Sequence, residues 1–210
     1  MLDGTKEIAL CEDSRYIPNV IDPSWIERLV KEVEFLPRKS LPFKIYGRTL
    51  LLPRDKQFYG DVNPDGTFPL YRYGGNFIPP VLPWTPCLAE IRDIVRGRFG
   101  GVCNHTVVNR YVTGEDYIGY HRDKNRDFVL DSSVITVSLG TARPFYLRND
   151  KTKEIVKVLL EPGSVFVLGP VTNKLWKHSI PKKTDVGEMR ISVTIRCIKT
   201  IYDPKTQTIV

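Results

Sequence analysis

The chain has 210 residues, of which 41% are hydrophobic and 26% are charged, and this size and composition fit one soluble globular domain. No apolar run approaches a membrane span, the first residues are too polar for a secretory signal, and the four cysteines lack Cys-x-x-Cys or zinc spacing. We therefore expect a monomer of the nucleus or cytoplasm with reduced thiols and no membrane contact, and its net charge of +7 suits nucleic acid as a partner.

The first forty residues predict an extension followed by a helix. Residues 1–20 show no clear period, so we expect an N-terminal extension that is partly disordered. Asp22-Pro23-Ser24 is typical of a helix start, with Pro23 at the first helical position. An apolar stripe at helical spacing follows and ends at Pro37.

The next segment predicts loops and hairpins, and then a second helix. Residues 40–83 contain many prolines and aromatic side chains, together with the turn signal Asn63-Pro64-Asp65-Gly66. Thr85-Pro86 is typical of a helix start, and Gly97 and Gly100 are expected to mark the end of that helix.

The second half of the chain predicts a β-rich domain. Short segments that alternate polar and apolar residues follow one another, separated by turn residues. About eight strands in sequence predict a jelly roll, also described as a double-stranded β-helix, so the fold class is α+β and mainly β. The expected strands are 105–112, 117–121, 134–139, 144–148, 155–160, 165–168, 176–180 and 189–198.

Two histidines and an aspartate form a candidate metal site. In an extended segment His121 and Asp123 point to the same side, and His178 can supply a third ligand from a distant strand. Two histidines and one carboxylate can hold three facial positions of a non-haem Fe(II) ion and leave the others open. A His-x-Asp pair alone is more often a surface pair. His105, the third histidine, is most simply a buried or strand-end residue.

Two arginines predict a site for a dicarboxylate near that metal. Arg190 and Arg196 fall on the same face of one predicted strand, and a guanidinium group binds carboxylates in a fork. Asn109 and Tyr111 share a face of the strand before the metal ligands and can hydrogen-bond the same molecule, although a turn cap and a core tyrosine are alternatives. Iron and dicarboxylate together point to a 2-oxoglutarate-dependent oxygenase.

These residues lie in segments that resemble the AlkB-type dioxygenases, which oxidatively remove alkyl groups from nucleobases. The likeness rests on Asn109-Arg-Tyr111-Val-Thr-Gly-Glu-Asp-Tyr-Ile-Gly-Tyr-His121-Arg-Asp123 and on Arg190–Arg196, and it covers about residues 40–200. The resemblance implies Fe(II) on His121, Asp123 and His178. It implies 2-oxoglutarate, as co-substrate, on Asn109, Tyr111, Arg190, Thr194 and Arg196.

The resemblance is nearest to the branch of the family that repairs double-stranded DNA. Ile45-Tyr46-Gly47 stands where that branch has a hairpin whose aromatic residue helps to flip the base, and Arg54 follows at a matching interval. Tyr71 and Tyr73 correspond to aromatics that line the pocket of the flipped base. The resemblance thus adds Tyr46, Arg54, Tyr71 and Tyr73 as substrate-binding residues.

Two positions depart from the family pattern. Ser192 replaces the usual asparagine in the co-substrate pocket, and Asn125 replaces an acidic residue that faces the damaged base. The second change leaves Asn125 as an uncharged substrate-binding residue, and the usual preference for positively charged lesions is therefore in doubt.

The implied function is direct-reversal repair of DNA by oxidative demethylation of N-alkylated bases. Alternatives are an RNA demethylase of the same family, a 2-oxoglutarate hydroxylase with another substrate, an inactive nucleic-acid-binding module and a purely structural jelly roll. The expected parts of the chain are an extension at 1–20, helices with a nucleotide-recognition lid at 21–100, the catalytic core at 101–200 and a tail at 201–210.

Overall fold

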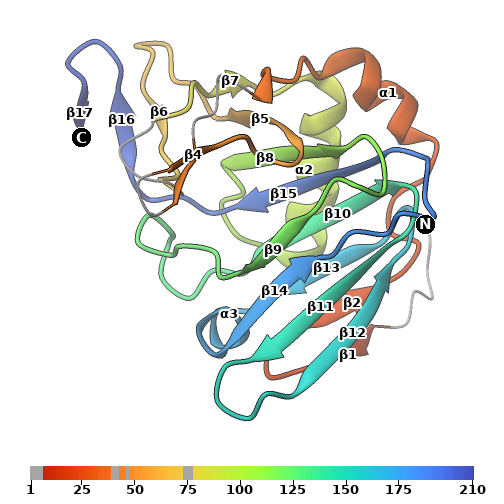
Figure 1. Ribbon diagram of the computed structural model, residues 1–210. Coiled ribbons are helices and arrows are strands. Elements are labelled where there is room, and N and C mark those ends of the chain that lie inside the picture. The colour runs from red at the N-terminus through yellow and green to blue at the C-terminus, as the bar shows by residue number, and fades with distance from the viewer. Residues whose placement is uncertain (1–6, 39–42, 46–47, 73–77) are drawn as a thin grey trace.

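The computed structural model describes residues 7–38, 43–45, 48–72 and 78–210, and its two main sheets face each other as in a jelly roll (Figure 1). The larger sheet has the strand order β1-β2-β13-β10-β15-β8-β5-β7, and the smaller sheet has the order β12-β11-β14-β9. The mainly β fold expected from the alternating pattern is thereby confirmed. Among the described residues, no helix has both the length and the apolar character needed to cross a membrane.

The larger sheet consists of β1 (Ile8–Ala9), β2 (Arg15–Ile17), β5 (Asp55–Gly60), β7 (Leu82–Pro83), β8 (His105–Tyr111), β10 (Val134–Gly140), β13 (Val165–Leu168) and β15 (Arg190–Arg196). The smaller sheet consists of β9 (Ile118–His121), β11 (Arg143–Asn149), β12 (Ile155–Leu160) and β14 (Trp176–Ile180). The remaining strands form two small sheets: β3 (Phe43–Ile45) with β4 (Arg48–Leu50), and β6 (Phe68–Pro69) with β16 (Ile201–Asp203) and β17 (Thr208–Ile209).

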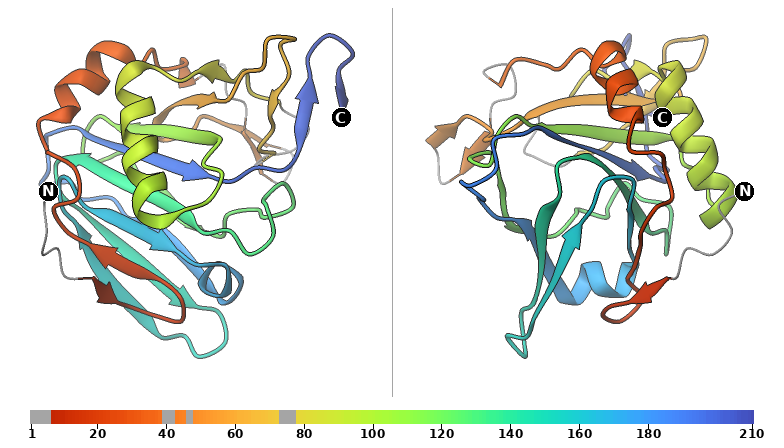
Figure 2. Two further views of the ribbon diagram at one scale, coloured as in Figure 1. Left: turned by 180° about the vertical axis from the view of Figure 1, so that it is seen from behind. Right: turned by 90° about the vertical axis from the view of Figure 1, so that its right-hand side faces the viewer.

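Two helices cover the outer face of the larger sheet. Figure 2 shows α2 (Pro86–Phe99) lying across its strands, with α1 (Trp25–Glu32) beside it, whereas α3 (Pro170–Leu175) is a short helix before β14. Thr85 caps α2, because its side chain accepts a hydrogen bond from the backbone of Leu88, and Pro86 occupies the first turn, where its missing N–H costs nothing. The helix passes through Gly97 and ends at Gly100, whose positive φ of 73° suits glycine.

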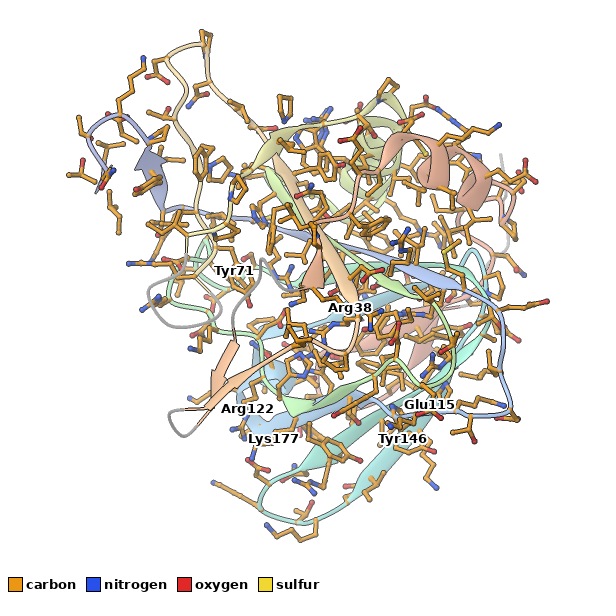
Figure 3. All side chains as sticks on the ribbon, turned by 45° about the horizontal axis from the view of Figure 1, so that its top comes forward. Arg38, Tyr71, Glu115, Arg122, Tyr146 and Lys177 are labelled. Carbon is orange, nitrogen blue, oxygen red and sulfur yellow. The ribbon has the colours of Figure 1, made fainter. Side chains whose placement is uncertain are left out.

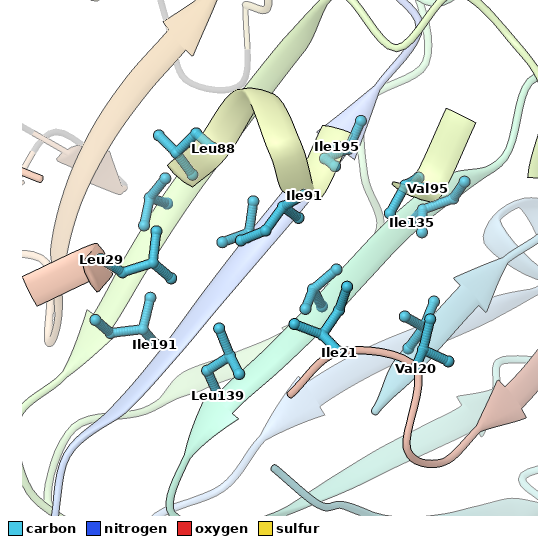
Figure 4. Close-up of a cluster of buried hydrophobic side chains, with 14 of the residues drawn as sticks. Val20, Ile21, Leu29, Leu88, Ile91, Val95, Ile135, Leu139, Ile191 and Ile195 are labelled. Carbon is cyan, nitrogen blue, oxygen red and sulfur yellow. The ribbon is translucent and has the colours of Figure 1, made fainter. Parts of the chain in front are cut away.

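The helices and the sheet enclose an apolar core. Leu88, Ile91 and Val95 on one side of α2 point at strands β10 and β15, where Ile135 and Ile195 are buried (Figure 4). Burial of each such side chain stabilises the fold by about 1.5–3 kcal/mol relative to exposure. This layer fixes the outer face of the larger sheet and leaves its inner face to the smaller sheet and to the cavity between them.

Three local expectations differ from the structure. Residues 7–20 are not an unattached extension, because β2 pairs with β13 and buries Tyr16 and Ile17 against it. Helix α1 begins at Trp25 with Ser24 as its N-cap, and it ends at Glu32 rather than at Pro37. The expected C-terminal tail at 201–210 contains two strands, since β16 pairs with both β6 and β17.

Candidate metal centre and co-substrate pocket

Antiparallel pairing of β9 and β14 brings together the three expected metal ligands. His121 at the end of β9 lies directly opposite His178 on β14, and the centroids of the two rings are 4.2 Å apart. Asp123 follows two residues later and turns toward the same point. One potential ligand atom from each of the three side chains lies within 4.8 Å of the other two, which suits a single bound cation.

The protonation states of these side chains also suit a cation. Burial lowers the pKa of His178 to about 3, so its ring is neutral at physiological pH and has a lone pair to donate. Burial opposes ionisation of Asp123, but the charge of Arg196 and the two histidines outweigh it and hold the pKa of this carboxyl below its usual range. His121 Nδ1 lies 2.9 Å from the carbonyl oxygen of Gly119, which orients the ring.

Two neighbours hold Asp123 in place. Arg196 Nη2 donates to its Oδ2 at 2.7 Å, and Asn173 forms two hydrogen bonds with its backbone. Arg196 therefore lies beside the candidate metal ligand, and its guanidinium group also stacks over the ring of Tyr71 at 4.5 Å. Asn173 was not anticipated from the sequence, because only the fold brings α3 next to this loop.

The expected co-substrate residues face the same space from the larger sheet. On β15, Arg190 lies opposite Tyr111 of β8, and Ser192 lies opposite Asn109. The side chain of Arg190 is only 1% exposed, and its guanidinium lies 5.2 Å from the centre of the Tyr111 ring. Its Nη2 donates to Ser138 Oγ at 2.9 Å, whereas Nε and Nη1 have no hydrogen-bond partner among the described residues.

A buried guanidinium with unused N–H groups fits an incoming carboxylate. Leaving such donors unsatisfied is costly, and a charged acceptor would form strong hydrogen bonds with them. Ser192 and Thr194 lie on the same face of β15 and line the cavity without adding charge. The donor set of Arg190, Tyr111 and Asn109 therefore fits one end of a dicarboxylate that reaches toward the three metal ligands.

The expected metal and co-substrate residues line one cavity of about 590 Å³ between the two sheets. Two of the expected substrate residues, Arg54 and Tyr71, line it as well. Arg54 donates through Nε to Asn109 Oδ1 at 3.1 Å and through Nη1 to the carbonyl oxygen of Tyr117 at 3.2 Å. In Figure 3, Tyr71 and Arg122 mark two lining residues that come from different parts of the chain.

Of the other expected substrate residues, Tyr46 and Tyr73 lie outside the described residues. Asn125 is exposed and borders a separate cavity of about 120 Å³, because a turn closed by the hydrogen bond from Phe128 N–H to Asn125 O carries it away from the metal ligands. The expectation that Asn125 faces a substrate base is therefore not supported by its position.

Two side chains outside the predicted site belong to its surroundings. His105 is fully buried, with its ring 6.0 Å from that of Tyr71 and its backbone opposite Arg196, and burial, followed by the charge of Arg196, lowers its pKa to about 3. Lys56 on β5 lines the cavity and is only 6% exposed. The alternation of side chains along β5 could have indicated Lys56, since it places this residue two positions after Arg54 on the same face.

Comparison with known proteins adds family information to this geometry. Residues 13–196 match the family described as the 2OG-Fe(II) oxygenase superfamily. The chain is 33% identical over 180 residues to the DNA oxidative demethylase ALKBH2 of Bos taurus, and the match covers 82% of this chain and 63% of that protein. It is 33% identical over 178 residues to the same enzyme of Mus musculus, covering 81% of this chain and 72% of the relative.

A more distant relative and a solved structure agree with this picture. Alpha-ketoglutarate-dependent dioxygenase alkB homolog 3 of Homo sapiens is 25% identical over 198 residues, which are 89% of this chain and 65% of that protein. The structure of OsALKBH1 superposes with a TM-score of 0.62 at 16% identity, covering 91% of this chain and 100% of the other, and it supports the fold. The chain thus spans roughly two thirds of the length of these curated relatives.

Proposed function

Because the chain belongs to the 2OG-Fe(II) oxygenase superfamily, we propose that it oxidatively removes alkyl groups from N-alkylated bases in DNA, with Fe(II) and 2-oxoglutarate. The observation that carries this proposal is the pairing, in one cavity, of a His-Asp-His cluster with a buried arginine that has unused donors. The names of the ALKBH2 relatives support DNA as the substrate. The reaction would reverse base damage directly and so repair DNA.

In this proposal His121, Asp123 and His178 hold the Fe(II) ion. When bound there, the iron would supply the oxidation of an N-alkyl carbon, with 2-oxoglutarate as the co-substrate. Asp123 stays ionised because the positive charge of Arg196, which donates to its Oδ2, stabilises the carboxylate. Asn173 and Gly119 orient the ligands before the metal arrives.

We place 2-oxoglutarate along β15 and β8. Arg190 and Tyr111 bind its distal carboxylate at the closed end of the cavity, and Asn109, Thr194 and Arg196 line the part that leads to the metal. Arg190 sits at full burial, so water is excluded from this charge pair and the interaction gains strength from the low local dielectric.

The substrate base then enters from the remaining side of the cavity. A base inside a duplex cannot reach a buried metal, so the target must be single-stranded or flipped out. Tyr71 and Arg54 line the cavity where such a base would lie, and Tyr46 and Tyr73 are proposed to act on the same base. Residues 101–200 thus provide the catalytic core, and residues 21–100 provide the helices and the recognition lid.

One experiment tests the proposal directly. The protein is incubated anaerobically with Fe(II), 2-oxoglutarate and oligonucleotides that each carry one methylated base, then exposed to air, and the base masses are followed. We expect at least one methylated base to lose about 14 Da, the mass of one CH₂ group, and one succinate to form for each methyl group removed. His178→Ala is the matched negative control. Turnover of 2-oxoglutarate that no DNA or RNA oligonucleotide stimulates would instead favour a hydroxylase of another substrate class.

The site also bears on assembly and location. One chain supplies all the proposed metal ligands and co-substrate residues, so the proposed reaction does not require a second copy, and we propose that a monomer is active. The three buried cysteines and Cys11 are unpaired among the described residues, which supports our proposal of an intracellular protein of the nucleus or cytoplasm.

A further inference from the structure

Two buried cysteines meet at one end of the neighbouring strands β8 and β15. Cys103 precedes β8 and Cys197 follows β15, and the backbone N–H of Cys103 donates to Cys197 Sγ at 3.3 Å. The two residues are 1% and 7% exposed, respectively. They are 94 positions apart in the sequence, so the antiparallel pairing of β8 with β15 is what brings them together.

The backbone on both sides of the cysteine pair is held in place. The side chain of Asn104 accepts a hydrogen bond from the N–H of Ile198 and donates another to its carbonyl oxygen, both at 2.8 Å. Gly101 approaches so closely that a Cβ atom there would lie 3.0 Å from Cys197 Sγ. The turn before β8 therefore wraps around this sulfur atom, and the two thiols stay neighbours as long as β8 and β15 are paired.

The same turn favours a thiolate at Cys197. The backbone N–H groups of Val102 and Cys103 donate to its sulfur, and successive N–H groups in a turn form a concave site for an anion. A hydrogen bond from the Cys103 thiol, together with these N–H groups, outweighs burial and lowers the pKa of Cys197, whereas it raises the pKa of Cys103. Burial instead raises the pKa of Cys11 and of Cys87 to about 11. Cys197 is therefore the cysteine best suited to act as a nucleophile.

We propose that Cys103 and Cys197 form a site of reversible oxidation, where hydrogen peroxide converts the two thiols into a disulfide. The thiolate of Cys197 attacks one oxygen and breaks the O–O bond, which gives a sulfenic acid and a hydroxide ion that takes the proton of the Cys103 thiol. The sulfur of Cys103 then attacks the sulfenic sulfur, forms the S–S bond and releases a second hydroxide ion. That ion takes the proton that Cys197 had lost. The two thiols thus give up two electrons and two protons, and the peroxide becomes two molecules of water.

The disulfide closes a loop that contains the candidate metal centre. All three proposed metal ligands lie between Cys103 and Cys197 in the sequence. Arg196, the residue directly before Cys197, binds the carboxylate of Asp123. A cross-link that closes a long loop removes conformational entropy from the unfolded chain and so stabilises the folded one. Oxidation therefore stabilises the segment that carries the metal ligands, and this inference does not depend on the substrate of the enzyme.

The test uses the full-length, metal-free protein, because bound iron itself reacts with peroxide. The wild type is treated with a small excess of hydrogen peroxide, unfolded and alkylated with N-ethylmaleimide, and mass spectrometry of the protein and its peptides counts and locates the free thiols. Cys103→Ser and Cys197→Ser are treated in the same way. Cys87→Ser is the matched control, because Cys87 is also buried but lies on α2. Circular dichroism checks the folding of each variant and gives its melting temperature.

We expect the wild type to lose two of its four thiols, to yield a peptide cross-linked between Cys103 and Cys197, and to recover both thiols with dithiothreitol. Cys87→Ser should form the same cross-link, Cys197→Ser should keep its remaining thiols, and Cys103→Ser should stop at a sulfenic acid that dimedone traps.

The cross-link should also raise the melting temperature of the wild type by about 5–10 °C. Four free thiols in the peroxide-treated wild type, or a cross-link through Cys11 or Cys87, would overturn the inference. A cross-linked protein with an unchanged melting temperature would overturn the stabilising effect of the disulfide. Each of these results is independent of whether the enzyme demethylates DNA.

Discussion

Arg190 gives the sharpest test of the co-substrate pocket. Its guanidinium is 1% exposed, makes one side-chain hydrogen bond to Ser138, and leaves Nε and Nη1 without a described partner. Arg190→Lys keeps the positive charge but replaces the planar donor set by a single ammonium, which binds a carboxylate as a point charge. The variant should lose about one charge-assisted hydrogen bond to 2-oxoglutarate, or about 1.5–3 kcal/mol. This loss weakens binding roughly 10- to 100-fold.

The affinity is measured by isothermal titration of 2-oxoglutarate into the protein loaded with Mn(II), a redox-inert substitute for Fe(II). Arg143→Lys is the matched control, since Arg143 is equally buried but uses its terminal nitrogens on backbone carbonyls. We expect the control to lose stability and to keep most of its affinity for 2-oxoglutarate. Unchanged 2-oxoglutarate affinity in Arg190→Lys, in a folded protein, would refute the assignment of Arg190 to a carboxylate.

Three further predictions follow from the same region. Asp123→Ala should lower the free energy of unfolding of the metal-free protein by about 3–5 kcal/mol in urea denaturation, because it leaves Arg196 buried without its carboxylate; Asp123→Asn also removes the charge and should lose most of the same stability, so wild-type stability in Asp123→Asn would argue against the ion pair as the cause. The pKa of His105 is about 3 in the fold and about 6.5 when unfolded, so the unfolded state takes up the proton and stability falls as pH drops from about 6.5 toward 3. His105→Leu should flatten that part of the stability curve, and a curve parallel to the wild type would contradict the burial argument. Tyr46→Ala should reduce activity on double-stranded more than on single-stranded substrate, and equal losses on both would assign Tyr46 to packing instead of base flipping.

The sequence was most informative where one local pattern decides the structure. Strands 155–160, 165–168 and 176–180 have the predicted bounds, since alternation of apolar residues and flanking turns define both their faces and their ends. The start of α2 was also predictable, because Thr85 and Pro86 perform their capping roles within four residues of chain. In such segments the residues that determine the structure are neighbours in the sequence.

Prediction failed where the partner is distant in the chain. Arg15–Ile17 is too short to show a period, and it becomes a strand only because β13 offers it an edge. Leu36 forms a bridge with Lys56 rather than extending α1, although its apolar side chain continues the helical stripe. Alternation along β5 places Lys56 on the same face as Arg54, but the pairing of β5 with β8, which brings that face to the cavity, is a contact between distant parts of the chain.

The same contrast between local and long-range determinants applies to the residues of the candidate site. His121 and Asp123 could be paired from their spacing, and His178 was chosen as the third ligand because it lies on a distant predicted strand in a chain with three histidines. The cross-strand register places His178 opposite His121. Asn125 was placed by analogy alone, and the turn to Phe128 carries it to another cavity. Motif spacing therefore identifies ligands that share a strand, whereas residues on loops require the tertiary structure.

The buried arginines explain how one sheet sandwich can hold both a stable frame and a reactive cavity. Arg143 is fully buried, and its terminal nitrogens donate to the carbonyl oxygens of Thr113, Asp116 and Pro181, so it ties the loop before β9 to the end of β14. Arg190 is buried to the same degree on β15 of the larger sheet, yet two of its three nitrogens find no described acceptor. Both terminal nitrogens of Arg143 have acceptors and only its Nε lacks one, whereas Arg190 lacks an acceptor at Nε and at the terminal Nη1. An unsatisfied buried donor destabilises the fold, so a carboxylate at Arg190 would remove a larger penalty than a ligand at Arg143. The number of free terminal nitrogens, rather than burial or residue type, therefore distinguishes the arginine that holds the two sheets together from the arginine proposed to bind a carboxylate.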